Sequence, residues 1–262
     1  MTDVCCCASC GIAGVDDVTL KDCDGGCDLV KYCSDMCQEN HREHHDEECK
    51  NRAAEMMHDK QLFTQPDESC LGECSICCLP LPLIQSKYFL TSCCSKYICN
   101  GCDYANQKRE FEAGLEGRCA FCREPISDSQ EESDKRAMER AKKNDPVALT
   151  QMGKKCKEEG DYRKAFEYYT KAAELDHVDA HASLGILYLK GEGVEKDDKK
   201  LNYHLEQAAI GGHPQARYNL ALYEAKNGRF ERAKKHYIIA ANLGDHVSLQ
   251  DIKQLYVQGV VS

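Results

Sequence analysis

The sequence contains no tryptophan, no apolar run long enough to cross a membrane and no apolar segment behind Met1. We therefore expect neither a transmembrane helix nor a secretory signal, and an intracellular location, cytoplasmic or nuclear. Acidic residues outnumber basic ones, 44 to 34, so the formal net charge is -10. A chain of this charge is poorly suited to neutralising phosphates, so we expect neither nucleic acid nor a membrane as a partner.

Cysteine is abundant but unevenly distributed. Of the twenty cysteines, nineteen lie at or before Cys122 and only Cys156 lies beyond it. In a reducing compartment, closely spaced cysteine pairs bind metal more readily than they form disulfides. The distribution therefore predicts metal-binding modules before Cys122 and a domain of a different kind after it.

The first cysteine array opens with Cys7-x2-Cys10 and closes with His45-x3-Cys49. A spacing of four places both side chains of the last pair on one face of a helix. A short helix is expected over residues 38–50, which contain neither proline nor glycine. Several further side chains near the arrays are expected not to bind metal: Cys5, Cys6, Cys70, His41 and His44.

The stretch Tyr32-Cys33-Ser34-Asp35-Met36-Cys37-Gln38, with His45 and Cys49 behind it, resembles a MYND-type zinc finger over residues 7–49. The resemblance implies that alternate pairs share a zinc ion. One ion would be held by Cys7, Cys10, Cys33 and Cys37. The other would be held by Cys23, Cys27, His45 and Cys49. Fingers of this type bind short peptides of partner proteins and are not catalytic, since four protein ligands leave no open position.

Two features depart from the MYND pattern. Three residues separate Cys23 from Cys27, where the family usually has two, and Arg42 stands where an aromatic residue is common. The first departure weakens the assignment of Cys23 as a ligand. The second removes some packing and part of a peptide-binding surface.

The second cysteine array supplies eight thiols, which is the number that two tetrahedral zinc ions require. These thiols are Cys74, Cys77, Cys93, Cys94, Cys99, Cys102, Cys119 and Cys122. The array resembles a RING-type finger over residues 73–126, except that Lys96 occupies the slot of the usual histidine. An ammonium group cannot coordinate zinc, so Cys93 is the favoured eighth ligand and Cys78 the alternative. In the cross-brace that the resemblance implies, one ion would be bound by Cys74, Cys77, Cys99 and Cys102. The other would be bound by Cys93, Cys94, Cys119 and Cys122.

The RING resemblance also implies a ubiquitin-conjugating enzyme as a partner. Ile76 occupies the position of an apolar contact with that enzyme, and Arg123 the position of an arginine that bridges to ubiquitin. Ala120, in place of a common proline, and the absence of tryptophan argue against ligase activity. No residue is expected to be catalytic in itself, because RING ligases perform no covalent chemistry.

The C-terminal tract is repetitive. Segments of the form Ala-x3-Met/Leu-Gly/Ala begin at Ala148, Ala180 and Ala216, with a related segment at Ser248, so the starts are 32, 36 and 32 residues apart. The four extra residues fall in the loop over residues 190–194. This tract resembles Sel-one-type, tetratricopeptide-like repeats, in which helix hairpins stack because none buries its apolar face alone.

The sequence thus predicts a multidomain fold with two small zinc-stabilised modules before an all-α repeat solenoid. The expected parts are a MYND finger at 7–49, a linker at 50–72, a RING-type finger at 73–126, a charged linker at 127–145 and helical repeats at 146–262. About four zinc ions are expected, two per finger. We expect a ubiquitin ligase whose MYND finger and repeats recruit protein targets; the alternative is a non-catalytic scaffold for protein–protein interaction.

Overall fold

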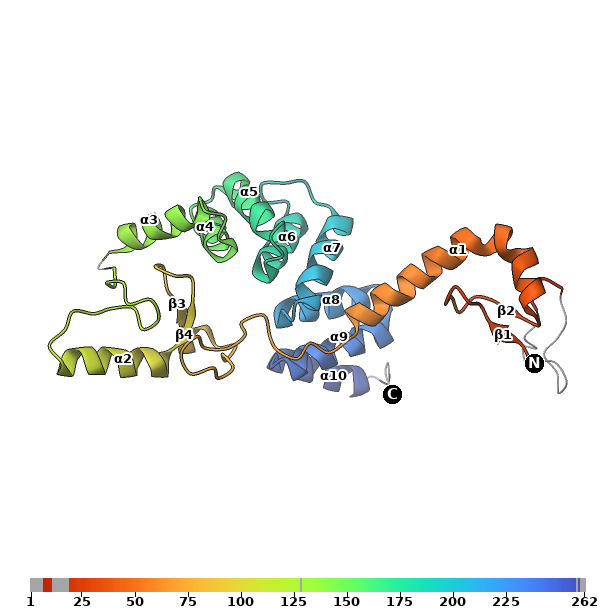
Figure 1. The fold of residues 1–262 in the computed structure, drawn as a ribbon, viewed down its shortest axis with the longest axis horizontal. Helices are drawn as coiled ribbons and strands as arrows, with labels where there is room; N and C mark the ends of the chain where they lie inside the picture. Colours follow the sequence, from red (N-terminus) through yellow and green to blue (C-terminus); the bar gives the residue numbers. More distant parts are fainter. Residues whose placement is uncertain (1–6, 11–18, 128, 258, 260–262) are drawn as a thin grey trace. The chain divides into compact units, whose positions relative to one another are not determined.

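The computed structural model describes residues 7–10, 19–127, 129–257 and 259. The chain divides into two compact units, Met1–Thr64 and Gln65–Ser262. The first contains two short strands and one helix, and the second contains the remaining elements (Figure 1).

In the first unit, strands β1 (Lys21–Asp22) and β2 (Lys31–Tyr32) pair antiparallel, and helix α1 (Asp35–Leu62) follows them. The side chain of Ser34 caps α1 by accepting a hydrogen bond from the amide of Cys37 at 3.2 Å. No proline or glycine interrupts the next 28 residues. The short helix expected over residues 38–50 is therefore part of a longer helix that continues into the stretch expected to be a linker.

The second unit begins with a small module, here called the central module (residues 71–126). A single 3-10 turn, η1 (Gln85–Lys87), precedes strands β3 (Tyr88–Leu90) and β4 (Tyr97–Cys99), which pair antiparallel, and helix α2 (Asn100–Glu112) follows directly. Its buried core is small and consists of Cys74, Leu81, Ile98 and Cys119. Half of these residues are cysteines, so little apolar packing holds this module together.

Helix α3 (Gln130–Ala141) lies in the stretch expected to be an exposed charged linker. Ser129 caps it by accepting a hydrogen bond from the amide of Glu132. Ala137 and Ala141 are buried in the same core as the first repeat helices. Most side chains of α3 are charged, as the sequence indicates. Its two buried alanines, however, lie at helical spacing and pack one face of the helix against the repeats.

The repeats form three helix hairpins and a final helix, as the spacing predicts (Figure 1). The helices are α4 (Pro146–Glu158), α5 (Tyr162–Ala173), α6 (Val178–Lys190), α7 (Asp198–Ile210), α8 (Pro214–Lys226), α9 (Phe230–Asn242) and α10 (His246–Val257). The longer loop lies between α6 and α7, where the four extra residues were located.

Small residues let the paired helices approach closely. A Cβ atom at Gly153 would lie 2.6 Å from the ring of Tyr169, and one at Gly185 would lie 3.1 Å from Leu205. Alanines such as Ala165 and Ala208 are fully buried between helices. The repeats therefore bury Ala, Leu and Tyr side chains between their helices, in contrast to the central module. Among the described residues, no helix is long and apolar enough to cross a membrane.

Candidate metal centres

Four groups of side chains converge in the structure, and their members coincide with the four quartets that the sequence predicts. Within each group the ligand atoms all lie within 4.8 Å of one another. In the first unit the groups are Cys7, Cys10, Cys33 and Cys37, and Cys23, Cys27, His45 and Cys49. In the central module they are Cys74, Cys77, Cys99 and Cys102, and Cys93, Cys94, Cys119 and Cys122.

The separations within these groups suit tetrahedral zinc. With Zn–S bonds of about 2.3 Å, two sulfurs at adjacent corners lie about 3.8 Å apart. The Sγ atoms of Cys77 and Cys99 are 3.9 Å apart, and those of Cys33 and Cys37 are 3.6 Å apart. A quartet completed by four protein ligands leaves no position for a substrate, so these groups fit structural rather than catalytic zinc.

Helix α1 presents one face to both quartets of the first unit. His45 Nε2 lies 3.2 Å from Cys27 Sγ, which identifies Nε2 as the ligand atom. His41 lies one turn earlier; its Nδ1 is 3.0 Å from the hydroxyl of Tyr32, and its ring stacks on that of His45. His41 thus supports the site without joining the quartet.

The three-residue spacing between Cys23 and Cys27 is accommodated by two glycines. A Cβ atom at Gly25 would lie 2.4 Å from Cys49 Sγ, so only glycine leaves room for that sulfur. Gly26 has a φ of +75° and donates a hydrogen bond to the carbonyl of Cys23 at 2.9 Å. The departure from the usual MYND spacing is therefore a local glycine turn that keeps Cys23 in reach of its quartet.

The cysteine loops of the central module share one backbone conformation. The residues that directly follow Cys77, Cys94 and Cys122 each have a positive φ. These are Cys78 at 54°, Ser95 at 49° and Arg123 at 64°. The amides of Cys78 and Arg123 donate to the carbonyls of Cys74 and Cys119 respectively. In these tight turns, backbone amides point towards the sulfur atoms of the ligand cysteines. At Cys74, burial alone would raise the pKa of the thiol, but hydrogen bonds from backbone amides, that of Cys99 foremost, lower it to about 6.

The adjacent Cys93 and Cys94 both join one quartet because the loop between β3 and β4 turns sharply at them. Thr91 Oγ1 accepts from the amide of Lys96 and lies 3.0 Å from Cys94 Sγ. The structure thus brings Cys93, rather than the alternative Cys78, to the other three thiols.

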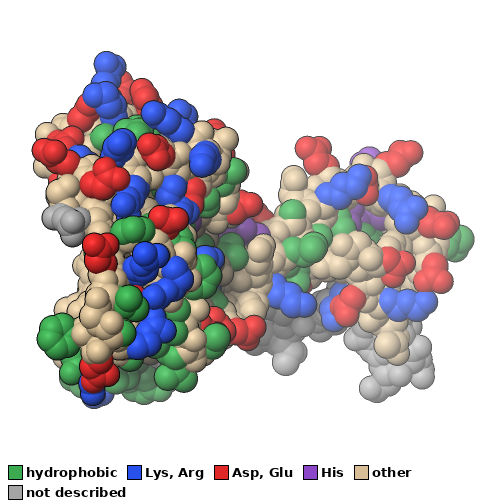
Figure 2. All heavy atoms as spheres, turned by 60° about the vertical axis from the view of Figure 1, so that its left-hand side comes forward, with side chains coloured by type: hydrophobic (Ala, Val, Ile, Leu, Met, Phe, Trp, Pro, Cys, Tyr) green, Lys and Arg blue, Asp and Glu red, His purple; other side chains and the backbone are tan. Residues whose placement is uncertain are grey.

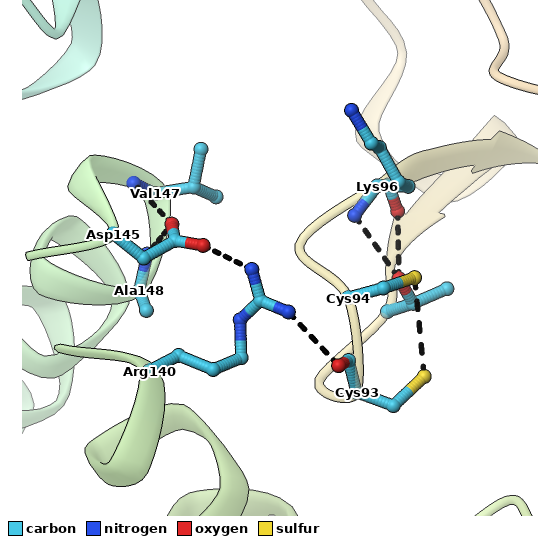
Figure 3. A network of polar contacts seen from close by, with 8 residues as sticks. Cys93, Cys94, Lys96, Arg140, Asp145, Val147 and Ala148 are labelled. Atoms are coloured by element: carbon cyan, nitrogen blue, oxygen red, sulfur yellow. Dashed lines mark hydrogen bonds and ion pairs between the residues drawn. The ribbon is translucent and has the colours of Figure 1, made fainter. Parts of the chain in front are cut away.

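A side chain outside the module also holds this loop (Figure 3). Arg140 of α3 donates to the carbonyl of Cys93 at 2.9 Å and pairs with Asp145. Asp145 in turn accepts from the amides of Val147 and Ala148 and so caps α4. One continuous polar network therefore connects the fourth quartet to the first repeat. Sequence reasoning missed it, because Arg140 lies in a run of charged residues with no distinguishing spacing.

Arg123 makes contacts inside the central module. Its guanidinium donates to Asn106 Oδ1 at 2.8 Å and to Glu110 Oε1 at 2.6 Å. Glu110 is only 2% exposed and also accepts from the amide of Arg118 at 2.8 Å. Hydrogen bonding to the Arg118 amide and to Arg123 lowers the pKa of Glu110. Arg123 therefore fixes helix α2 to the last cysteine loop.

Several apolar side chains of the central module reach the surface. Ile76 is 41% exposed, and Phe111 and Leu115 on and beyond α2 are also exposed. In Figure 2, hydrophobic side chains reach the surface at the lower end of the larger body. Ile76 is the residue that the sequence analysis proposed for contact with a conjugating enzyme.

Comparison with known families assigns two of the three parts. Residues 7–49 match the MYND finger model. Residues 146–177, 178–213 and 214–245 each match the Sel1 repeat model. The chain contains a MYND finger and three Sel1 repeats. Both sequence resemblances are thereby confirmed, whereas a RING-type identity for the central module stays a prediction.

Two curated relatives come from Helicobacter pylori, strains J99 and 26695, and carry the description "Putative beta-lactamase HcpC". They are 41% identical over 56 residues and 40% identical over 52 residues, or 21% and 20% of this chain. The matched segments span 19% and 18% of those proteins, about a fifth of their length.

Two solved structures also resemble the chain. A Sel1 repeat protein from Oxalobacter formigenes has a TM-score of 0.47 at 23% identity, covering 60% of this chain and 63% of that protein. A protective antigen with an SLR fold, from uropathogenic Escherichia coli strains, has a TM-score of 0.47 at 22% identity, covering 61% and 33%.

Proposed function

We propose that the protein is a zinc-binding scaffold whose MYND finger and Sel1 repeats each bind a protein partner. Zinc serves structure here: four ions, one per quartet, would each have four protein ligands and no open position. MYND fingers and Sel1 repeats are interaction modules, and a scaffold needs no further chemistry.

A groove beside the repeats is the observation that supports this function best. It has a volume of about 1090 Å³ and lies within the second unit. The walls include Tyr88 and Tyr97 of the hairpin, Ile186 of α6, and Lys154 and Lys157 of α4. The walls also carry the carboxylates of Asp134, Glu158, Glu159 and Asp179. Aromatic and aliphatic surface beside charges of both signs suits a peptide with both apolar and charged side chains.

Peptide selection on the full-length, zinc-loaded protein tests this function. Random peptides would be displayed and enriched on the wild type, then tested by titration against Lys154→Glu with Lys157→Glu. We expect groove-binding peptides to lose at least tenfold in affinity. Lys171→Glu is the matched control, because this exposed lysine of α5 lies outside the groove wall. Failure to enrich any peptide, or equal losses in both variants, would contradict repeat-mediated binding.

A RING-type ubiquitin ligase is the second candidate. Its support is the order β3–β4–α2 with two quartets drawn from alternating cysteine pairs, together with the exposed side chain of Ile76. The internal contacts of Arg123 with Asn106 and Glu110 weigh against a role for this arginine in bridging to ubiquitin.

Discharge of ubiquitin from a panel of loaded conjugating enzymes separates the two candidates. A ligase would accelerate discharge, and Ile76→Ala would abolish that acceleration at unchanged zinc content. Ile84→Ala, at an exposed position of the same module, is the control. If the fully metallated protein accelerates discharge from no enzyme of the panel, the ligase function is ruled out and the scaffold function remains.

A further inference from the structure

A fifth group of potential ligand atoms lies apart from the four quartets. It consists of Cys70 from the segment before the central module, Asp179 near the start of α6 and His213 immediately before α8. The three ligand atoms lie within 4.8 Å of one another. They come from segments more than thirty residues apart in the sequence, so no local motif brings them together.

The separations within the group are close to those expected around a metal ion. His213 Nε2 lies 3.8 Å from Asp179 Oδ1, beyond the range of about 2.7–3.2 Å for N–H···O bonds. Around a tetrahedral zinc ion, a nitrogen and an oxygen at adjacent corners lie about 3.4 Å apart, and a sulfur and an oxygen about 3.6 Å. The Cys70 thiol donates a hydrogen bond to the same Asp179 oxygen, and the Sγ–Oδ1 distance of 3.5 Å also fits that edge. Both distances are near the tetrahedral edges.

The backbone around the group is held in place. The amide of Cys70 donates to the carbonyl of Gly212 at 3.0 Å. Gly212 has a φ of +80°, and a Cβ atom there would lie 2.5 Å from the carbonyl oxygen of Glu68. Only glycine permits this approach, which sets Cys70 beside His213. The side chains of Cys70 and His213 therefore lie on two loops whose backbones are held in contact.

We propose that Cys70, Asp179 and His213 form a fifth metal site, for zinc or a similar divalent transition-metal ion. Cysteine, histidine and aspartate are all established zinc ligands, whereas an all-oxygen set would favour calcium or magnesium. Three protein ligands leave one coordination position open. Asp179 and His213 line the groove described above, so this position would be accessible from the groove. The four quartets have no such position.

The site would bind more weakly than the quartets. His213 Nδ1 accepts a hydrogen bond from the amide of Ala216 at 3.2 Å and so caps α8. When Nε2 binds a metal ion, the hydrogen of the neutral ring lies on Nδ1. Nδ1 can then no longer accept from the amide of Ala216, so the cap is lost. Burial and the Asp179 charge raise the pKa of the Cys70 thiol, so the ion must also displace its proton. The fifth ion should therefore be the first to leave when a chelator is added.

Cadmium-113 NMR of the full-length, cadmium-loaded protein tests the proposal. Each bound ion gives its own resonance, whose position depends on the number of thiolate ligands. We expect one resonance upfield of the thiolate-rich quartets, which disappears first on chelator titration. Cys70→Ser and His213→Asn should each remove it and lower the metal content by one ion per chain.

The variants are chosen to preserve folding. Asparagine is a strong helix N-cap, so His213→Asn keeps an acceptor for Ala216 while removing the imidazole. His177→Asn is the matched control, because His177 precedes α6 at the equivalent position of the preceding repeat and lies outside the group. The wild type alone can overturn the proposal, if it shows no resonance outside the thiolate-rich region. Survival of the upfield resonance in both Cys70→Ser and His213→Asn would also overturn it.

Discussion

The cysteine modules and the repeats differ in what their folded structures bury. In the first unit the buried cluster consists of Tyr32 and ligand cysteines, with partly buried Leu20 and Val30 around it. The first repeats instead bury a contiguous set of Ala, Leu and Tyr side chains. Without metal, the cysteine modules would bury little more than thiols, whereas the repeats have a core of their own. Stability should therefore depend on zinc in one part of the chain and on packing in the other.

Removing zinc should give the largest effect. Structural zinc contributes about 10–16 kcal/mol of apparent binding free energy per site, which in such modules is folding free energy. A strong chelator at neutral pH should unfold both cysteine modules and leave helices α4–α9 folded. Hydrogen exchange measured by mass spectrometry would show the difference segment by segment.

Cys74→Ser provides the genetic form of this experiment. The fully buried Cys74 belongs to one quartet of the central module, and the variant should lose protection there but not in the MYND finger. Cys156→Ser is the control, because Cys156 is a buried thiol of α4 outside all groups. Simultaneous collapse of the repeats on chelation would contradict the division between metal-held and packing-held parts.

A cavity in the repeats should have the converse effect. Leu184 of α6 is 1% exposed, so Leu184→Ala removes buried methyl groups at a cost of about 2–5 kcal/mol. Urea unfolding followed by circular dichroism should show the loss, at unchanged zinc content. Leu189→Ala on the same helix is the control, since Leu189 is 54% exposed and should cost little. Loss of zinc from Leu184→Ala would show that the modules depend on the repeats.

The local features of both parts could be predicted from the sequence. A Cys-x2-Cys pair forms its own turn, and a repeat of 32 or 36 residues records one hairpin, so ligands and helices are encoded over short stretches. Interactions between distant segments were not predictable. Nothing near Arg140 points to the carbonyl of Cys93, and nothing near Cys70 points to Asp179, 109 residues away. The sequence analysis expected Cys70 not to bind metal.

The Arg140 network connects the two kinds of structure and should have an intermediate effect. Arg140→Gln removes a charged donor from the carbonyl of Cys93 and a partner from Asp145, a loss of about 1–3 kcal/mol. Zinc bound near Cys93 should leave at lower chelator concentration, while helices α5–α9 keep their protection. Lys142→Gln, at the exposed C-cap residue of α3, is the control. Equal zinc retention in both variants would mean that the network does not couple quartet and repeat.

Acidification should reveal the smallest difference, and we expect it to act on the repeats through the half-buried side chain of His204. Burial foremost, and then the nearby charges of His181 and Lys200, lower the pKa of His204 from 6.5 to about 4. Between these values the unfolded chain binds a proton that the folded chain does not, so stability is complete above pH 6.5 and falls as the pH drops towards 4. The loss at pH 5 should be about 1–2 kcal/mol, allowing for partial solvent screening.

The matched variants isolate this effect from zinc release, which acid also promotes. His204→Gln should show a smaller fall in repeat stability between pH 7 and pH 5 than the wild type, measured by urea unfolding. His246→Gln, at an exposed position of α10, should fall as much as the wild type. An identical fall in all three proteins would show that His204 does not carry the acid sensitivity of the repeats, in which burial also lowers the pKa values of His177, His181 and His213.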